Sequence, residues 1–262
     1  MKRHLILVVC LTLFLASQAW AGQFGPITSR VQSGQFYLGG GYMNLTEKLD
    51  AGDNAYNLDG KEPLETRQNS LYLQAGVGIG RGWEGYIRGG VSDFQVESLD
   101  YQWTNQSSES SSELRPFFSA GIGGPAFSGP TLSVGPFVQV SYYSDYEDEK
   151  SGSFSGNPGK EKFFFDNAIN VDLGFTFETV LEGAVLYGGP IVSFYDSKIK
   201  SAFYASDSNL GTATEGWHDL KLDSSYGGFF GINWPLNESL QLNAEGQYRS
   251  GLGIGGNLIY TF

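Results

Sequence analysis

Residues 251–262 read Gly-Leu-Gly-Ile-Gly-Gly-Asn-Leu-Ile-Tyr-Thr-Phe, with apolar side chains at Leu252, Ile254, Leu258, Tyr260 and Phe262. Glycine, asparagine and threonine occupy most of the positions between them. A period of two places the two kinds of side chain on opposite faces of a β-strand. This stretch therefore predicts a strand with one apolar face.

The same alternation recurs along the chain. It is clearest in residues 71–79, 132–142, 169–177 and 240–249, and less regular in residues 34–45, 83–95, 113–123, 183–195 and 219–234. With the last segment this makes ten strands, each near the ~9–11 residues that a tilted strand needs to cross a bilayer.

The connections between these strands fall into two alternating classes. Short ones cover residues 80–82, 124–130, 179–182 and 235–238, whereas long polar ones cover about 46–68, 96–112, 144–162 and 196–218. Short periplasmic turns and long external loops are typical of outer-membrane barrels. We predict an all-β fold, a closed antiparallel transmembrane β-barrel of about ten strands, with eight or twelve as alternatives.

The first 21 residues have the three parts of a secretory signal peptide. Lys2 and Arg3 form a basic head, residues 5–15 an apolar run, and Ala19-Trp20-Ala21 a cleavage site. We expect export by the Sec pathway, a short periplasmic segment over residues 22–33 and a single barrel domain over residues 34–262.

The mature chain is acidic. Removing residues 1–21 from the chain of net charge −12 takes away two basic residues and no acidic ones, which leaves −14. This balance argues against nucleic acid as a partner, which needs a basic surface. After residue 21 no apolar run approaches the ~18 residues of a spanning helix, so an embedded chain would cross as strands.

Alternation also occurs in soluble sandwiches, whose apolar face covers a dry core. Here the polar face is rich in glycine, amides and charges of both signs, which suits a barrel lumen. Trp83 and Trp234 lie in phase with the apolar positions beside short turns, and Phe163 and Phe165 are predicted to do the same beside a long loop. This phase predicts aromatic rings at both membrane interfaces. Pro136 and Pro190 fall within strands, where we expect bulges or breaks.

The terminal Phe262, with Tyr260, Leu258, Ile254 and Leu252, resembles the C-terminal signature of bacterial outer-membrane proteins. Strand and turn phrases such as residues 75–80 before Trp83, and residues 86–90, are similar to small porin-like barrels of Gram-negative bacteria. The resemblance implies an outer-membrane location, folding by the barrel-assembly machinery, and contact with outer-membrane lipid and lipopolysaccharide. It implies no particular activity, and oligomeric state stays open.

His218, in Trp217-His218-Asp219, is the one histidine after the predicted signal peptide. The outer-membrane phospholipase and the lipid A deacylase pair a histidine with a serine two residues on, where this chain has Leu220. The ten-stranded omptin proteases use an Asp–His pair, but adjacent residues on a strand point to opposite faces, which places Asp219 poorly. We predict no catalytic residues and treat His218 as a solvated loop residue.

Two predicted loops are acidic, but we predict no metal or cofactor site in either. One contains Asp145, Glu147, Asp148 and Glu149; the other contains Asp50, Asp53, Asp59, Glu62 and Glu65. Neither has the spacing of an EF-hand.

A ten-stranded barrel has a narrow lumen. Six charged residues are predicted to pair inside it: Glu84, Arg88, Arg115, Asp172, Glu245 and Arg249. The sequence therefore favours a non-enzymatic outer-membrane barrel that anchors acidic surface loops, with either a polar plug or a narrow path for small solutes. The alternatives are an omptin-like hydrolase using His218 and a secreted soluble β-sandwich that binds a ligand.

Overall fold

The structure is a computed structural model that describes residues 24–27, 31–50, 63–101, 106–111, 114–154, 157–205, 212–214 and 216–262. The predicted signal peptide, residues 1–21, lies outside them. Every regular element in the described part of the chain is a β-strand. The described residues contain no helix long and apolar enough to cross a bilayer.

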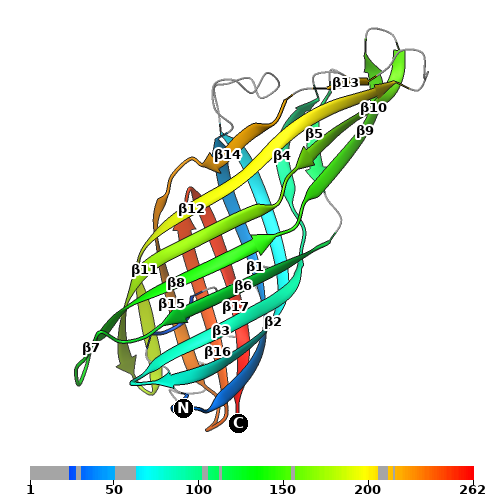
Figure 1. The fold of residues 1–262 in the computed structure, drawn as a ribbon. Coiled ribbons are helices and arrows are strands. Elements are labelled where there is room, and N and C mark those ends of the chain that lie inside the picture. Colours follow the sequence, from blue (N-terminus) through cyan, green and yellow to red (C-terminus); the bar gives the residue numbers. More distant parts are fainter. Residues whose placement is uncertain are drawn as a thin grey trace, which may run out of the picture.

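Ten strands form the barrel wall, as the alternation predicted (Figure 1). They are β1 (Phe36–Asp50), β2 (Leu64–Gly80), β3 (Trp83–Ser92), β6 (Arg115–Gly123), β8 (Ser133–Tyr143), β11 (Ala168–Leu181), β12 (Ala184–Ala205), β15 (Tyr226–Pro235), β16 (Leu240–Arg249) and β17 (Gly251–Thr261). Each pairs antiparallel with the next, and β17 pairs with β1 from Tyr37↔Thr261 to Leu45↔Gly253. The last strand therefore closes the sheet on the first.

Seven shorter strands complete the fold, and six of them lie where long connections were expected or next to them. They are β4 (Gln95–Tyr101), β5 (Gln106–Ser111), β7 (Phe127–Ser128), β9 (Tyr146–Phe154), β10 (Asn157–Phe165), β13 (Thr212–Thr214) and β14 (His218–Leu222). All but β7 extend the wall beyond one end of the barrel (Figure 1). Residues 219–234, expected as one strand, belong instead to β14 and β15.

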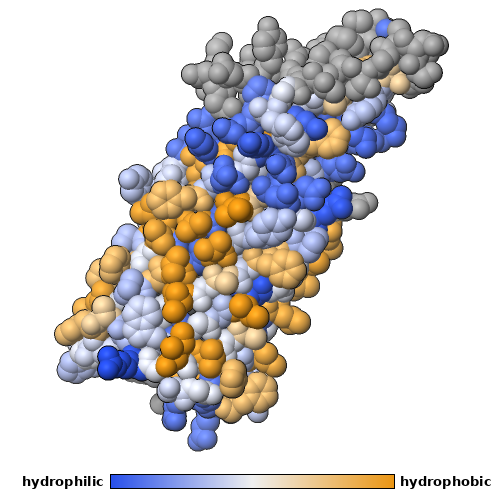
Figure 2. Space-filling view, in the orientation of Figure 1, coloured by the Kyte–Doolittle hydropathy of each residue, from blue (hydrophilic) through white to orange (hydrophobic). Residues whose placement is uncertain are grey.

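The two faces of the wall differ in polarity as the alternation requires. Leu73, Ile87, Phe118 and Phe230 point outward and are 59–74% exposed. Figure 2 shows hydrophobic residues gathered over the lower and middle part of the barrel, with residues of intermediate hydropathy between them, and hydrophilic residues concentrated above. The inward positions are instead filled by amides, hydroxyls, charges and tyrosines. A soluble barrel would have the opposite arrangement, so the outer surface is built for an apolar medium.

Aromatic rings in the lumen lie against glycines of the neighbouring strand. A Cβ added to Gly76, Gly121 or Gly231 would come within 2.4 Å of the paired tyrosine's ring, which is Tyr37, Tyr86 or Tyr187 respectively. Two more inward-facing cross-strand pairs bring a ring against a glycine: Tyr72 against Gly41, and Phe137 against Gly174. At these five positions glycine is needed because the neighbouring ring occupies the space of a side chain.

The expected irregularities at the two prolines differ: at Pro136 the register of β8 with β11 is uninterrupted, although its pairing with β6 ends at Phe137. Opposite Pro190 and Gly189 the pairing of β11 with β12 is interrupted at Phe175 and Thr176, which is a local break of the expected kind.

The four aromatic residues expected at the membrane interfaces do not all point outward. Trp83 and Trp234 share the outward phase of Ile87 and Phe230. Phe163 and Phe165 do not: both are buried in the interior. Asp166 and Asn167 separate β10 from β11 and reset the phase, so the prediction for these two rings was wrong.

Candidate functional site

The lumen begins, at the end with the short turns, with a segment of the chain itself. Phe24 and Gly25 donate their backbone N–H groups to the Glu245 carboxylate, at 3.2 and 3.0 Å. Ile27 donates its backbone N–H to Glu178 at 3.0 Å. The Phe24 ring lies 4.7 Å from the ring of Phe137 and 5.1 Å from that of Phe229, centroid to centroid. Residues 24–27 therefore plug the barrel from within.

A row of hydrogen-bonded asparagine side chains, the amide ladder, runs from strand to strand along the inner face of the wall beside this plug. Asn233 on β15 donates to Asn243 on β16, and Asn243 donates to Asn257 on β17 at 2.9 Å. Asn257 in turn donates to the Tyr72 hydroxyl at 3.4 Å. A cavity of about 40 Å³ lies between the ladder and the plug. A second, of about 10 Å³, lies under Phe24 and Ile27. These spaces hold at most a few water molecules, since one water needs ≳ 10–15 Å³.

Arg88 occupies the middle of the lumen. Its Nε donates to Gln74 at 2.7 Å and its Nη1 to Gln139 at 2.9 Å, and Tyr86 also donates to Gln139. The guanidinium lies 4.5 Å from the centre of the Tyr86 ring, so it is held by amides and a π face together. The sequence placed Arg88 in the lumen, but it did not single out Gln74 and Gln139 as its partners.

A buried ion cluster comes next. Arg249 forms an ion pair with Glu47, with Nε 2.7 Å from a carboxylate oxygen, and donates through Nη1 to Asp172. Ser193 donates to Asp172 at 2.6 Å and accepts from Arg249 at 3.1 Å. Arg249 and Asp172 both belong to the six charges expected to pair in the lumen, but the sequence did not predict which of them would pair. Glu47 was missed because residues 46–50 were expected to be loop, whereas β1 continues through them and turns Glu47 inward.

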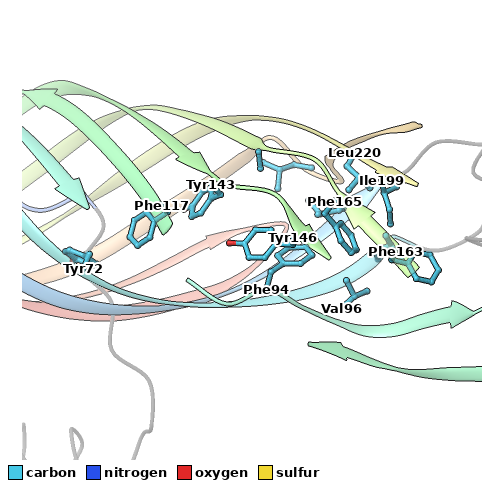
Figure 3. Packing of buried hydrophobic residues seen from close by; sticks show 14 residues of the cluster. Tyr72, Phe94, Val96, Phe117, Tyr143, Tyr146, Phe163, Phe165, Ile199 and Leu220 are labelled. Atoms are coloured by element: carbon cyan, nitrogen blue, oxygen red, sulfur yellow. The ribbon is translucent and has the colours of Figure 1, made fainter. Parts of the chain in front are cut away.

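A hydrophobic core closes the lumen at the end with the long connections (Figure 3). Its members come from the barrel and from the extension: Leu49, Leu64, Tyr72, Phe94, Val96, Phe117, Tyr143, Tyr146, Phe163, Phe165, Ala168, Ile199, Leu220 and Leu222. Figure 3 shows the Phe94 and Tyr146 rings packed together, with Phe165 beside them. The extension is thus a packed continuation of the wall. Arg115 begins β6 at this level and is half-buried.

The residues considered for chemistry do not converge. His218 is half-buried on the same face of β14 as Leu220, and Asp219 points away from it. In the part of the chain that the structure describes, His218 has no ion pair. No three acidic, histidine or cysteine side chains among the described residues could hold a metal ion. Asp53, Asp59 and Glu62 lie outside the described residues.

The acidic cluster at 145–149 is partly neutralised on the surface of the extension. Glu149 on β9 forms ion pairs with Lys160 and Lys162, which alternate on β10. Hydrogen bonds from these two lysines lower the pKa of Glu149, and the same contact raises the pKa of Lys162. The pairs are solvent-exposed and contribute little to stability.

Several solved structures are similar to this chain. They include the outer membrane protease OmpT from Escherichia coli, at 13% identity over 87% of this chain and 95% of that one, TM-score 0.46. The translocator domain of the autotransporter NalP from Neisseria meningitidis is 12% identical over 90% of each chain, TM-score 0.48. The toluene transporter TodX from Pseudomonas putida is 10% identical over 94% of each chain, TM-score 0.39. No protein-family model and no curated protein matches the sequence.

The class of protein follows from the chain's own geometry. It is a closed ten-stranded antiparallel barrel with an apolar outer band and a polar, filled lumen. This is the architecture of membrane-spanning β-barrels.

Proposed function

We propose that this protein is a non-enzymatic integral barrel of the bacterial outer membrane, which anchors a packed surface extension and does not conduct ions. The observation that carries the proposal is the filling of the lumen in successive layers. The plug of residues 24–27, the Arg88 network, the Arg249 cluster and the hydrophobic core follow one another along the barrel axis. An ion would have to displace all of them.

The orientation follows from the connections. Short turns face the periplasm and long connections the exterior in barrels of this class. The extension built from β4, β5, β9, β10, β13 and β14 would then stand on the cell surface. Its hydrophobic core gives it rigidity that a polar loop lacks, which suits a contact surface. Outer-membrane lipid, lipopolysaccharide and the barrel-assembly machinery are the partners we propose.

Planar-bilayer recording tests the closed lumen. Purified mature protein, folded in detergent and added to a bilayer, is expected to give no discrete conductance steps. A deletion of residues 24–27 is expected to remain silent too, because the Arg88, Arg249 and hydrophobic layers still block the path. Regular steps from the intact protein, confirmed with independently folded samples, would refute a non-conducting barrel.

A further inference from the structure

Residues 24–27 occupy the lumen in the manner of a bound ligand. Their N–H groups pair with no strand of the barrel and instead meet two carboxylates, Glu245 and Glu178. Pro26 has no N–H, so every donor of this short segment is satisfied by a side chain of the wall. The segment is thus held by contacts that any peptide of the same shape could make.

The wall offers a separate pocket for each of the segment's two large side chains. Phe24 enters an aromatic box in which Phe137 and Phe229 cross at 90°, with Tyr187 next to Phe229. Ile27 is 3% exposed, and its Cδ1 lies 3.3 Å from where a Cβ on Gly123 would stand. The glycine therefore leaves the space that Ile27 fills.

The main-chain contacts add directional recognition. One carboxylate takes two consecutive N–H groups, from Phe24 and Gly25, and the other takes the N–H two residues further on, from Ile27. Gly25 has φ near +79°, which lets the first two N–H groups converge on one carboxylate and favours glycine at this position. Hydrogen bonds to a charged acceptor are stronger than neutral ones.

We propose that this part of the lumen is a peptide-recognition site, filled in cis by residues 24–27. Its ligand is an extended peptide with a phenylalanine, then glycine, and a branched aliphatic residue three positions after the phenylalanine. The site lies toward the end with the short turns, so in the orientation proposed above a peptide would enter it from the periplasm. When the chain's own segment withdraws, a segment of another protein with this pattern takes its place.

The test removes the cis segment and supplies it in trans. The mature chain without residues 22–27 is folded in detergent and titrated, by calorimetry, with the amidated peptide Gly-Gln-Phe-Gly-Pro-Ile. We expect saturable one-to-one binding, weakened at least about tenfold when alanine replaces phenylalanine in the peptide, because the aromatic box is then empty. Glu245→Gln in the deleted chain should weaken binding to a similar extent. Glu238→Gln, the same charge change in an exposed turn, should not.

Absence of binding up to about 1 mM peptide by a folded deletion variant would refute the proposal. Equal binding of the two peptides would refute it as well. If the deletion variant does not fold, full-length mature Phe24→Ala replaces it, and the wild-type peptide should raise its thermal midpoint while the alanine peptide does not. An unchanged midpoint with both peptides counts against the site. These measurements are made in detergent, so they do not depend on membrane location or conductance.

Discussion

Replacing Arg249 by methionine should be among the most damaging single changes in the lumen. The guanidinium is 1% exposed and holds two carboxylates, Asp172 and Glu47, that are themselves buried. Methionine fills a similar volume but leaves both acids without their cation. Removing one partner of a buried ion pair costs about 3–5 kcal/mol, because the remaining charge is neither solvated nor paired. We expect a loss of that size in the free energy of unfolding.

The assay is urea unfolding of the barrel in lipid vesicles, followed by tryptophan fluorescence. The matched control is the triple variant Arg249→Met, Asp172→Asn and Glu47→Gln, which removes the cation and both charges together. It should recover most of the loss, since neutral groups are far cheaper to bury than unpaired charges. A single variant within about 1 kcal/mol of the parent would show that Arg249 does not hold the cluster, and so would a triple variant no better than the single one.

Three further outcomes follow from the wall and the extension. Gly121→Val pushes the Tyr86 ring off the wall and breaks its 2.6 Å hydrogen bond to Gln139, so it should destabilise the barrel by about 1–3 kcal/mol. Gly246→Ala should be near neutral in the same unfolding assay, because its Cβ would meet only the Gly253 carbonyl oxygen, at an ordinary contact distance of 3.9 Å. Leu73→Arg places a charge on the apolar outer band and should cost about 2–4 kcal/mol in vesicles, and a neutral result would contradict a lipid-facing position. Because the pKa of Glu149 is lowered in the folded protein, its stabilising contact is present above the ordinary value of 4.5 and is lost as pH falls below it. Amide protection factors in β9 and β10, which correct for the slower intrinsic exchange in acid, should therefore fall on acidification, and Glu149→Gln should reduce that dependence.

Alternation was sufficient to predict the ten wall strands because each strand has one face toward an apolar medium and the other toward a polar lumen. Leu71, Leu73 and Val77 show the pattern without interruption, and all lie on the outer side of β2. The prediction failed where both faces are apolar or where the phase is reset. Phe163 and Phe165 belong to the core of the extension, and nothing in their local sequence distinguishes a rim aromatic from a core one.

The candidate site was harder to predict for a different reason. Its charged members, Glu245 and Arg88, were identified as lumenal, but their partners were not. The recognition of residues 24–27 depends on main-chain N–H groups, which every sequence has and no motif marks. Glu47 was lost through a strand end misplaced by a few residues. A pairing across the lumen needs the register of several strands at once, which a single sequence does not supply.

Fractionation of cells that express the full chain tests the central claim most directly. The protein should be recovered in the outer membrane and resist extraction by urea at moderate concentration. Unheated samples should migrate faster on denaturing gels than boiled ones, since a closed barrel stays folded in detergent. Recovery in the soluble periplasmic fraction, with no shift on heating, would contradict a membrane-spanning barrel.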